Sequence, residues 1–240
     1  MESGVIQISK LVSFIVTTKN EEKYIGSCLA SIRNQTYKNI EIIVVDSFST
    51  DNTIGIVEKY ADKIIGKDCI MPTGRNMGAR YAKGNVLAFV DADVVLERDW
   101  LERLLPKLSE KVVAVAGDLY PEEMFGAKNL FLYLFIALSK LLTHLLNLDN
   151  IGNGGTAYII TREAFNNING YTNKFTTAED IDLSTRLRRA KYLIGFERKA
   201  KAHFSLRSFK KYGYMHRIIY WLKGGIQYLA LHKVVPDWRR

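Results

Sequence analysis

The sequence predicts an α/β fold built around a doubly wound, mainly parallel central sheet. Short runs of β-branched and aliphatic residues alternate with helical patterns through the first half of the chain, which is the rhythm of βαβ units. These runs are apolar at nearly every position, as expected of strands that helices cover on both faces. The 240 residues, 48% of them hydrophobic, suffice for one such Rossmann-like domain with its own core.

The expected elements follow one another at regular intervals. Strands are predicted at 12–18, 40–46, 62–66, 86–93 and 112–117, and helices at 21–34, 51–60, 73–83 and from residue 99 onward. The second half is less regular. It should contain a long apolar helix at 130–148, a glycine-rich turn and strand at GNGGTAYII, a helix at AEDIDLSTRLRRA and a last strand at YLIGFE.

Three of the predicted strands end in polar side chains. Thr18 ends the first strand, Asp46 the second, and Asp91 with Asp93 the fourth. Such sheets bind ligands at the carboxyl ends of their strands, so these side chains should meet at one site. Carboxylates two residues apart offer hard oxygen ligands to Mg²⁺ or Mn²⁺. Acidic residues also end many ordinary strands, and Asp46 could equally be a turn or helix-capping carboxylate.

Arg75 and the pair Glu179-Asp180 each allow two interpretations. Arg75 lies at the start of a predicted helix, where it could contact phosphate or a base, or simply be solvated. The two acids lie in the first turn of another helix, where negative charge stabilises the positive end of the helix dipole. Alternatively, one of them is a general base.

The order of the motifs resembles glycosyltransferase family 2, the inverting nucleotide-sugar transferases of the GT-A fold. The resemblance covers roughly Leu11 to Phe196. It is carried by VSFIVTTKNEEKYIGSCLASIRNQTYKNIEIIVVDSFSTDNT, GRNMGARYAKGNVLAFVDADVVLERDWLERLL, GNGGTAYIITREAFNNINGY and AEDIDLSTRLRRAKYLIGF. Several motifs in the right order are far more specific than any one of them.

This resemblance implies a role for each matching residue. The nucleotide-sugar site would consist of Thr18, Glu21, Asp46, Arg75, Asp91, Gly154 and Gly155. A divalent ion, Mg²⁺ or Mn²⁺, would be held by Asp93, Asp91 and a late histidine, here His203. Asp180, with Glu179 beside it, would take the proton from the acceptor hydroxyl as that hydroxyl displaces the nucleoside diphosphate in one inverting step.

The chain also departs from the family pattern in three places. The first motif reads Thr-Thr-Lys-Asn instead of Pro-Thr-Tyr-Asn, and the second reads Asp-Ser where many members have Asp-Asp. The base is therefore open between uracil and guanine, with UDP expected over GDP. The QxxRW motif of processive synthases is missing, since the tail has HRIIYW. Transfer of a single sugar by a hexosyltransferase is the expected reaction.

Positive charge is concentrated toward the end of the chain, which suggests a catalytic domain followed by a basic extension. The net charge is +9, and from Arg186 onward fifteen lysines and arginines face two acids. We expect a catalytic domain at 1–205, with a nucleotide-sugar half at about 1–118 and an acceptor half at about 119–205, followed by a basic, aromatic and helical extension at 206–240. Basic and aromatic residues together suit an anionic bilayer surface.

The apolar helix at 130–148 bears on localisation. Lys140 and His144 interrupt it, which argues against a transmembrane span and for an amphipathic helix, buried or at an interface. MESGVIQISK lacks the features of a signal peptide, and Cys28 and Cys69 are expected to be reduced thiols. The expected location is cytoplasmic and peripheral on the inner face of the membrane, with a lipid or lipid-linked acceptor of a cell-envelope glycan.

Three other interpretations fit parts of the sequence. A nucleotidyltransferase would also use a doubly wound sheet and paired carboxylates, but TTKNEEKY has no glycine for a phosphate loop. A nucleic-acid-binding module would explain the basic tail; however, carboxylates gathered at the sheet edge would repel phosphates, so no nucleic acid is expected. An inactive family member is disfavoured by the intact Asp91-Ala92-Asp93 and Glu179-Asp180 pairs.

Overall fold

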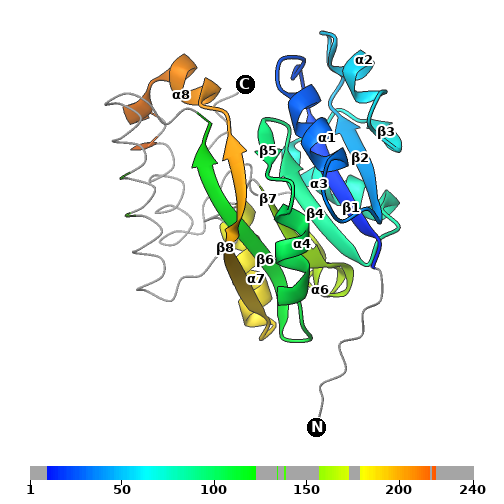
Figure 1. Ribbon diagram of the computed structural model, residues 1–240, viewed down its shortest axis with the longest axis vertical. Coiled ribbons are helices and arrows are strands. Elements are labelled where there is room, and N and C mark those ends of the chain that lie inside the picture. Colours follow the sequence, from blue (N-terminus) through cyan, green and yellow to red (C-terminus); the bar gives the residue numbers. More distant parts are fainter. Residues whose placement is uncertain are drawn as a thin grey trace.

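The computed structural model describes residues 10–122, 134, 138, 157–172, 179–216, 218 and 219. These residues form one eight-stranded sheet with helices on both of its faces (Figure 1). Its strands are β1 (Val12–Thr18), β2 (Ile40–Asp46), β3 (Lys63–Gly66), β4 (Val86–Asp91), β5 (Val94–Leu96), β6 (Val112–Pro121), β7 (Ala157–Thr161) and β8 (Leu193–Phe204). The helices are α1 (Ile25–Arg33), α2 (Thr53–Val57), α3 (Met71–Tyr81), α4 (Trp100–Leu104) with the 3₁₀ turn Leu105–Lys107, α6 (Arg162–Asn167), α7 (Glu179–Arg189) and α8 (Arg207–Tyr212).

The sheet has the strand order β3-β2-β1-β4-β7-β6-β8-β5. The first four strands are parallel, as the alternation of strands and helices predicts. β7 then pairs antiparallel with both β4 and β6, β6 and β8 are parallel, and β5 is an antiparallel edge strand. Four of the seven strand pairs are parallel, so the expected α/β fold with a mainly parallel sheet is confirmed.

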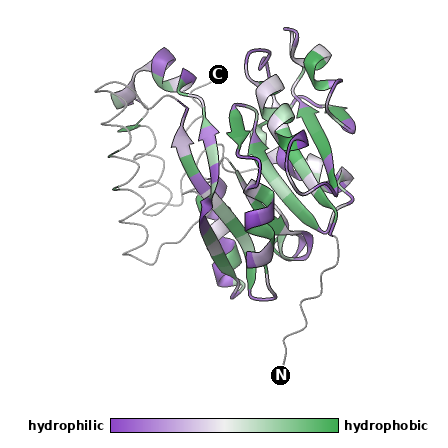
Figure 2. Cartoon of the chain, in the orientation of Figure 1, coloured by the Kyte–Doolittle hydropathy of each residue, from purple (hydrophilic) through white to green (hydrophobic). Residues whose placement is uncertain are grey.

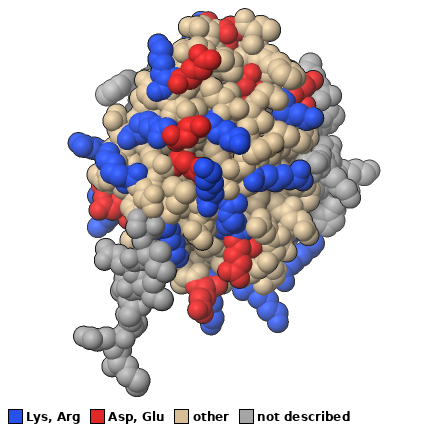
Figure 3. Space-filling view, turned by 90° about the vertical axis from the view of Figure 1, so that its right-hand side faces the viewer, with Lys and Arg blue, Asp and Glu red and all other residues tan. Residues whose placement is uncertain are grey.

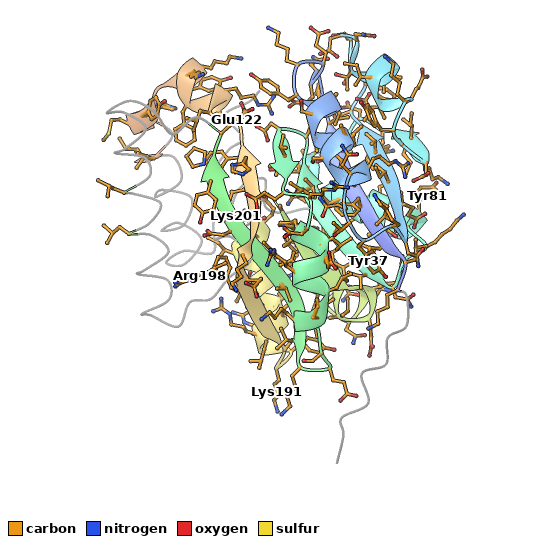
Figure 4. All side chains as sticks on the ribbon, in the orientation of Figure 1. Tyr37, Tyr81, Glu122, Lys191, Arg198 and Lys201 are labelled. Carbon is orange, nitrogen blue, oxygen red and sulfur yellow. The ribbon has the colours of Figure 1, made fainter. Side chains whose placement is uncertain are left out.

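The second half of the sheet differs from the sequence-based expectation in two respects. β5, only three residues long, was not expected, because Val94–Leu96 was taken to lie between the fourth strand and the next helix. The last strand was expected at YLIGFE, but β8 continues to Phe204. Its later half alternates between Ala200 and Ala202 in the core and exposed residues such as Lys201, labelled in Figure 4.

Two apolar cores lie on opposite faces of the sheet. Alternate residues of one strand enter different cores: in β1, Phe14 and Val16 face α1, α2 and α4, whereas Ile15 faces α3, α6 and α7. This explains why the strands are apolar at successive positions, and Figure 2 shows β1, β2 and β4 as hydrophobic along most of their length. The largest buried side chain, Trp100, anchors α4 on the first face.

Helix α3 lies unusually close to β1 because it carries glycines on the buried side. A Cβ atom at Gly78 would come within 2.4 Å of Cγ2 of Ile15, and one at Gly74 within 2.9 Å of Cγ2 of Thr17. Larger residues at these positions would push the helix away from the sheet. The close approach therefore sets the position of Arg75, which α3 carries toward the ends of the strands.

Gly78→Ala should lower the free energy of unfolding by about 1–3 kcal/mol, because the added methyl overpacks the contact with Ile15. Urea denaturation measures this. The matched control is Gly26→Ala in α1, where the new Cβ would meet Cγ2 of Ile56 at 3.4 Å and alanine favours the helix. Gly26→Ala should be neutral or stabilising. If Gly78→Ala has the same free energy of unfolding as the wild type, α3 can move away from β1 without cost, contrary to the prediction.

Candidate functional site

The polar ends of the parallel strands meet at one edge of the sheet, as the sequence predicts. Thr18 of β1 is paired in register with Asp46 of β2, and Thr17 with Asp91 of β4. The hydroxyl Oγ1 of Thr18 is buried and has no hydrogen-bond partner within the described part of the chain. Buried hydroxyls are almost always paired, so this one is available to a ligand at the strand ends.

Asp46 is the last residue of β2, and its side chain closes the turn that follows. It is 3% exposed, and its two oxygens accept from the backbone N–H of Ser49 at 2.8 Å and from the Ser49 hydroxyl at 2.5 Å. The turn carboxylate that the sequence allowed is therefore present. A carboxylate offers about four acceptor sites, so these bonds leave room for a nucleobase N–H, and that contact stays a prediction.

Arg75 contacts three carboxylates, one at the end of β4 and two that lie almost ninety residues later in the sequence. Its side chain is 3% exposed, and Nη2 donates to Oδ1 of Asp91 at 2.7 Å while Nη1 lies 3.4 Å from both Glu179 and Asp180. The guanidinium also lies over the ring of Tyr171, 5.2 Å from its centroid. The solvated alternative is excluded, because Arg75 is the buried bridge between β4 and the start of α7. We call Arg75, Asp91, Glu179 and Asp180 the inner cluster.

The pKa of Asp180 is raised well above its ordinary value within the inner cluster. Burial is the largest cause, and the negative charge of Glu179 is the second; Arg75 acts in the opposite direction. A carboxylate whose pKa is moved toward neutrality is a stronger base at physiological pH. The position and the shift both suit proton abstraction, the role expected of Asp180.

A second arginine holds the other two acidic residues. Nε of Arg207 donates to Oδ2 of Asp93 at 2.9 Å, and its two terminal nitrogens bind both oxygens of Glu21, Nη2 at 2.7 Å from Oε1. The guanidinium lies 4.8 Å from the ring centroid of Tyr24. We call Glu21, Asp93 and Arg207 the outer cluster. Burial and, to a smaller extent, the charge of Asp91 raise the pKa of Asp93, while Arg207 opposes this.

Sequence reasoning missed Arg207, although its position carries a signal. It is the first residue of α8, and a cation in the first turn of a helix is disfavoured by the helix dipole. An arginine there needs acidic partners from elsewhere in the chain, which Glu21 and Asp93 provide. The predicted domain boundary at residue 205 stays a prediction, and Leu206 and Phe209, just beyond it, are buried in the first core.

His203 contacts Glu97, and its expected role as a metal ligand stays a prediction. It lies on β8 opposite Val95, its Nε2 is 3.5 Å from Oε1 of Glu97, and its ring is near that of Tyr120. Within the described residues, no three His, Cys, Asp or Glu side chains form a group that could hold a metal ion. The His203 side chain is turned toward Glu97, and Arg207 is the residue that contacts Asp93.

Asp91 and Asp93 nevertheless fit a divalent cation that has further ligands from a substrate. Each binds its arginine through one carboxylate oxygen, and their side chains are 24% and 19% exposed. Five carboxylates against two guanidinium groups leave the two clusters with a formal excess of three negative charges. Mg²⁺ typically takes one or two carboxylates and completes its shell with phosphates and water. Gly154 and Gly155 lie outside the described residues.

Comparison with known proteins agrees with this geometry. The model of the family described as "Glycosyl transferase family 2" matches residues 13–169, well over half of the chain. The chain belongs to glycosyltransferase family 2.

Curated glycosyltransferases match less than half of the chain. "Putative glycosyltransferase EpsH" of Bacillus subtilis is 40% identical over 113 residues, covering 45% of this chain and 30% of EpsH. "UDP-Glc:alpha-D-GlcNAc-diphosphoundecaprenol beta-1,3-glucosyltransferase WfaP" of Escherichia coli is 40% identical over 89 residues, covering 35% of this chain and 36% of WfaP. The matches thus span less than half the length of these relatives.

A solved structure shares the fold. The mannosyltransferase PcManGT of Pyrobaculum calidifontis, in complex with GDP-Man and Mn²⁺, superposes with a TM-score of 0.63 at 20% identity, covering 82% of this chain and 57% of that one. At this identity the likeness shows the fold alone. It confirms the expected GT-A architecture for this family 2 chain.

The raised pKa of Asp180 gives a stability test that needs no substrate. A carboxyl whose folded pKa exceeds its unfolded value of about 3.9 destabilises the fold as pH rises through that interval. Asp180→Asn, which resembles the protonated form, should therefore gain stability relative to the wild type as pH rises above about 4. Urea denaturation across a pH series measures the difference.

The control for this test is Asp99→Asn. The hydrogen bond from Arg103 is the largest cause that lowers the pKa of Asp99, so this exposed variant should show a small effect of the opposite sign. If the free energy of unfolding of Asp180→Asn instead falls relative to that of the wild type as pH rises, the attraction of Arg75 for the charged carboxylate outweighs the effects of burial and of Glu179.

Proposed function

We propose that this chain is an inverting, metal-dependent hexosyltransferase that moves a single sugar from a nucleoside diphosphate sugar to an acceptor hydroxyl. The observation that carries the proposal is the link from Asp91 through the buried Arg75 to Asp180. It joins the acidic end of β4 to a carboxyl with a raised pKa, so the proposed diphosphate site and the proposed general base would lie side by side.

Asp180 takes the proton from the acceptor hydroxyl as this attacks the anomeric carbon. Arg75 orients Asp180 through their ion pair, while burial and, after it, the charge of Glu179 keep the pKa of Asp180 high. One base and one displacement give inversion at the anomeric carbon. Because no second carboxylate is assigned as a nucleophile, a covalent sugar intermediate is not part of this mechanism.

The donor diphosphate would lie next to Asp91 and Asp93. A bound Mg²⁺ or Mn²⁺ would neutralise the negative charge that grows on the leaving diphosphate. Asp93 and Asp91 would hold this ion. The hydroxyl of Thr18, which has no partner among the described residues, and Asp46 beside it would contact the nucleoside. Glu21 reaches the same region through its ion pair with Arg207.

The relatives support a choice of donor and acceptor. The name of WfaP specifies UDP-Glc and a diphosphoundecaprenol acceptor, whereas PcManGT was solved with GDP-Man and Mn²⁺. We favour UDP over GDP in this chain. We also favour a lipid or lipid-linked acceptor belonging to a cell-envelope glycan, with the enzyme acting in the cytoplasm on the inner face of the membrane.

The surface around α8 supports contact with an anionic bilayer. Lys210, Lys211, Met215 and Ile219 are exposed there, the last two at 58% and 45%. In contrast, Figure 3 shows acids interspersed with lysines and arginines on the side of the molecule near β3. Of the predicted apolar helix, only Leu134 and Leu138 are described; both are helical and exposed.

No helix within the described ranges is long and apolar enough to cross a bilayer.

Asp180→Asn should reduce turnover by about 10²–10⁴-fold, the usual contribution of a general base, and leave donor binding nearly unchanged. UDP- and GDP-sugars are first screened by thermal shift with and without Mn²⁺, because a ligand that binds only the folded state raises Tm. Transfer or hydrolysis of the best donor then gives turnover. The control is Asp182→Asn on the same helix, which breaks the ion pair with Arg186 and should affect stability more than turnover. Wild-type turnover by Asp180→Asn would refute the assignment of the base.

Reversing Lys210 and Lys211 to Glu should sharply weaken sedimentation with phosphatidylserine-containing vesicles at low salt, since each basic residue contributes about 1 kcal/mol near such a surface. The control reverses the exposed Lys59 and Lys67, which lie by α2 and β3 at the opposite side of the molecule (Figure 1). This changes the net charge equally. If both variants lose vesicle binding equally, or if the wild type does not bind, the proposal that the surface around α8 contacts the bilayer is wrong.

A further inference from the structure

We propose that Arg207 is a placeholder cation: it neutralises Glu21 and Asp93 in the donor-free protein, and releases Asp93 to a divalent ion and binds the donor diphosphate when these enter. The inference deepens the proposed function and rests on it for the identity of the diphosphate. Its first half, competition between Arg207 and a divalent ion, depends only on the outer cluster.

The contacts of Arg207 occupy its whole guanidinium group. Nε binds Asp93, and both terminal nitrogens bind Glu21 in the bidentate arrangement typical of strong arginine–carboxylate pairs. Glu21 follows β1 and Asp93 follows β4, and these strands are neighbours in the sheet. Arg207 therefore lies between two acids that converge at the strand ends, where a cation is needed.

A divalent ion on Asp93 would compete with this arrangement. Two cations on one carboxylate repel each other, and the repulsion is strong where water is partly excluded. A diphosphate removes the conflict, because it supplies oxygens to both cations at once. An arginine that leaves Asp93 for a phosphate exchanges one charge-assisted pair for another.

Arg207 differs from Arg75 in its freedom to make this exchange. The side chain of Arg75 is 3% exposed, and it is fixed by Asp91, Glu179, Asp180 and Tyr171. The side chain of Arg207 is 32% exposed and stems from the first residue of a six-residue helix. Phe209, buried in the core, keeps α8 in place while the long arginine side chain changes partners.

Arg207→Gln tests the placeholder through two binding measurements with opposite expected signs. Mn²⁺ alone, titrated by electron paramagnetic resonance without nucleotide, should bind the variant about tenfold more tightly than the wild type, because the competing cation is gone. Inorganic pyrophosphate at saturating Mn²⁺, measured by calorimetry, should bind about tenfold more weakly. A purely structural role would not move the two constants in opposite directions.

The matched control is Arg33→Gln. Arg33 is also half-buried, at 33%, and is paired with Asp62 away from the strand ends; its loss should change neither constant. If Arg207→Gln does not fold by circular dichroism, Arg207→Lys keeps the charge but not the bidentate contact, and should change both constants in the same directions by less. Unchanged or weaker Mn²⁺ binding overturns the proposal, as does unchanged pyrophosphate binding. Neither probe is a nucleotide sugar, so failure to find a donor is a separate result.

Discussion

Repulsion among carboxylates is the constraint around which the candidate site is organised. Glu21, Asp91 and Asp93 come from loops and strand ends at one edge of the sheet, and Glu179 with Asp180 comes from the start of α7. Within the described chain, two arginines bridge them. Because these arginines leave the acids in formal excess, the site retains a capacity for further positive charge, as a metal-assisted transfer from a diphosphate requires.

These acidic residues lie where the sheet changes from parallel to antiparallel pairing. β4 pairs parallel with β1 on one side and antiparallel with β7 on the other. Strand ends of the parallel half supply the residues expected to bind the nucleotide. Glycines in α3 let that helix lie close to β1. From there Arg75 reaches the start of α7, which covers the same face of the sheet. The two halves of the domain are thus joined through an ion-pair network as well as through strand pairing.

Much of this arrangement could be predicted from local sequence. Apolar runs ending in Thr18, Asp46 and Asp91 identified β1, β2 and β4 and their common edge, since the βαβ rhythm requires parallel neighbours. The position of β7 between β4 and β6 could not be predicted in this way, because an antiparallel pairing across a long separation leaves no local pattern. β5 was missed because three residues do not establish a periodicity.

The site residues likewise divide into those with a local sequence pattern and those that depend on distant parts of the fold. Asp91, Asp93, Glu179 and Asp180 were found as motifs, and Asp46 proved to have the turn contacts that its surroundings in the sequence allowed. The partner of Asp93 depends on where β8 ends and α8 begins. A histidine and an arginine four residues apart were both available, and in the structure the arginine is the one that contacts the aspartate, which no local pattern indicates.

The place of Arg207 at the beginning of α8 has a consequence for where the proposed transfer would occur. The same short helix carries Lys210 and Lys211 on its exposed side, one turn from the guanidinium that touches Asp93. Because the buried Phe209 keeps α8 in place, a bilayer bound through these lysines would lie about one helical turn from the proposed donor site. The proposed transfer would then take place next to the surface that carries a lipid-linked acceptor.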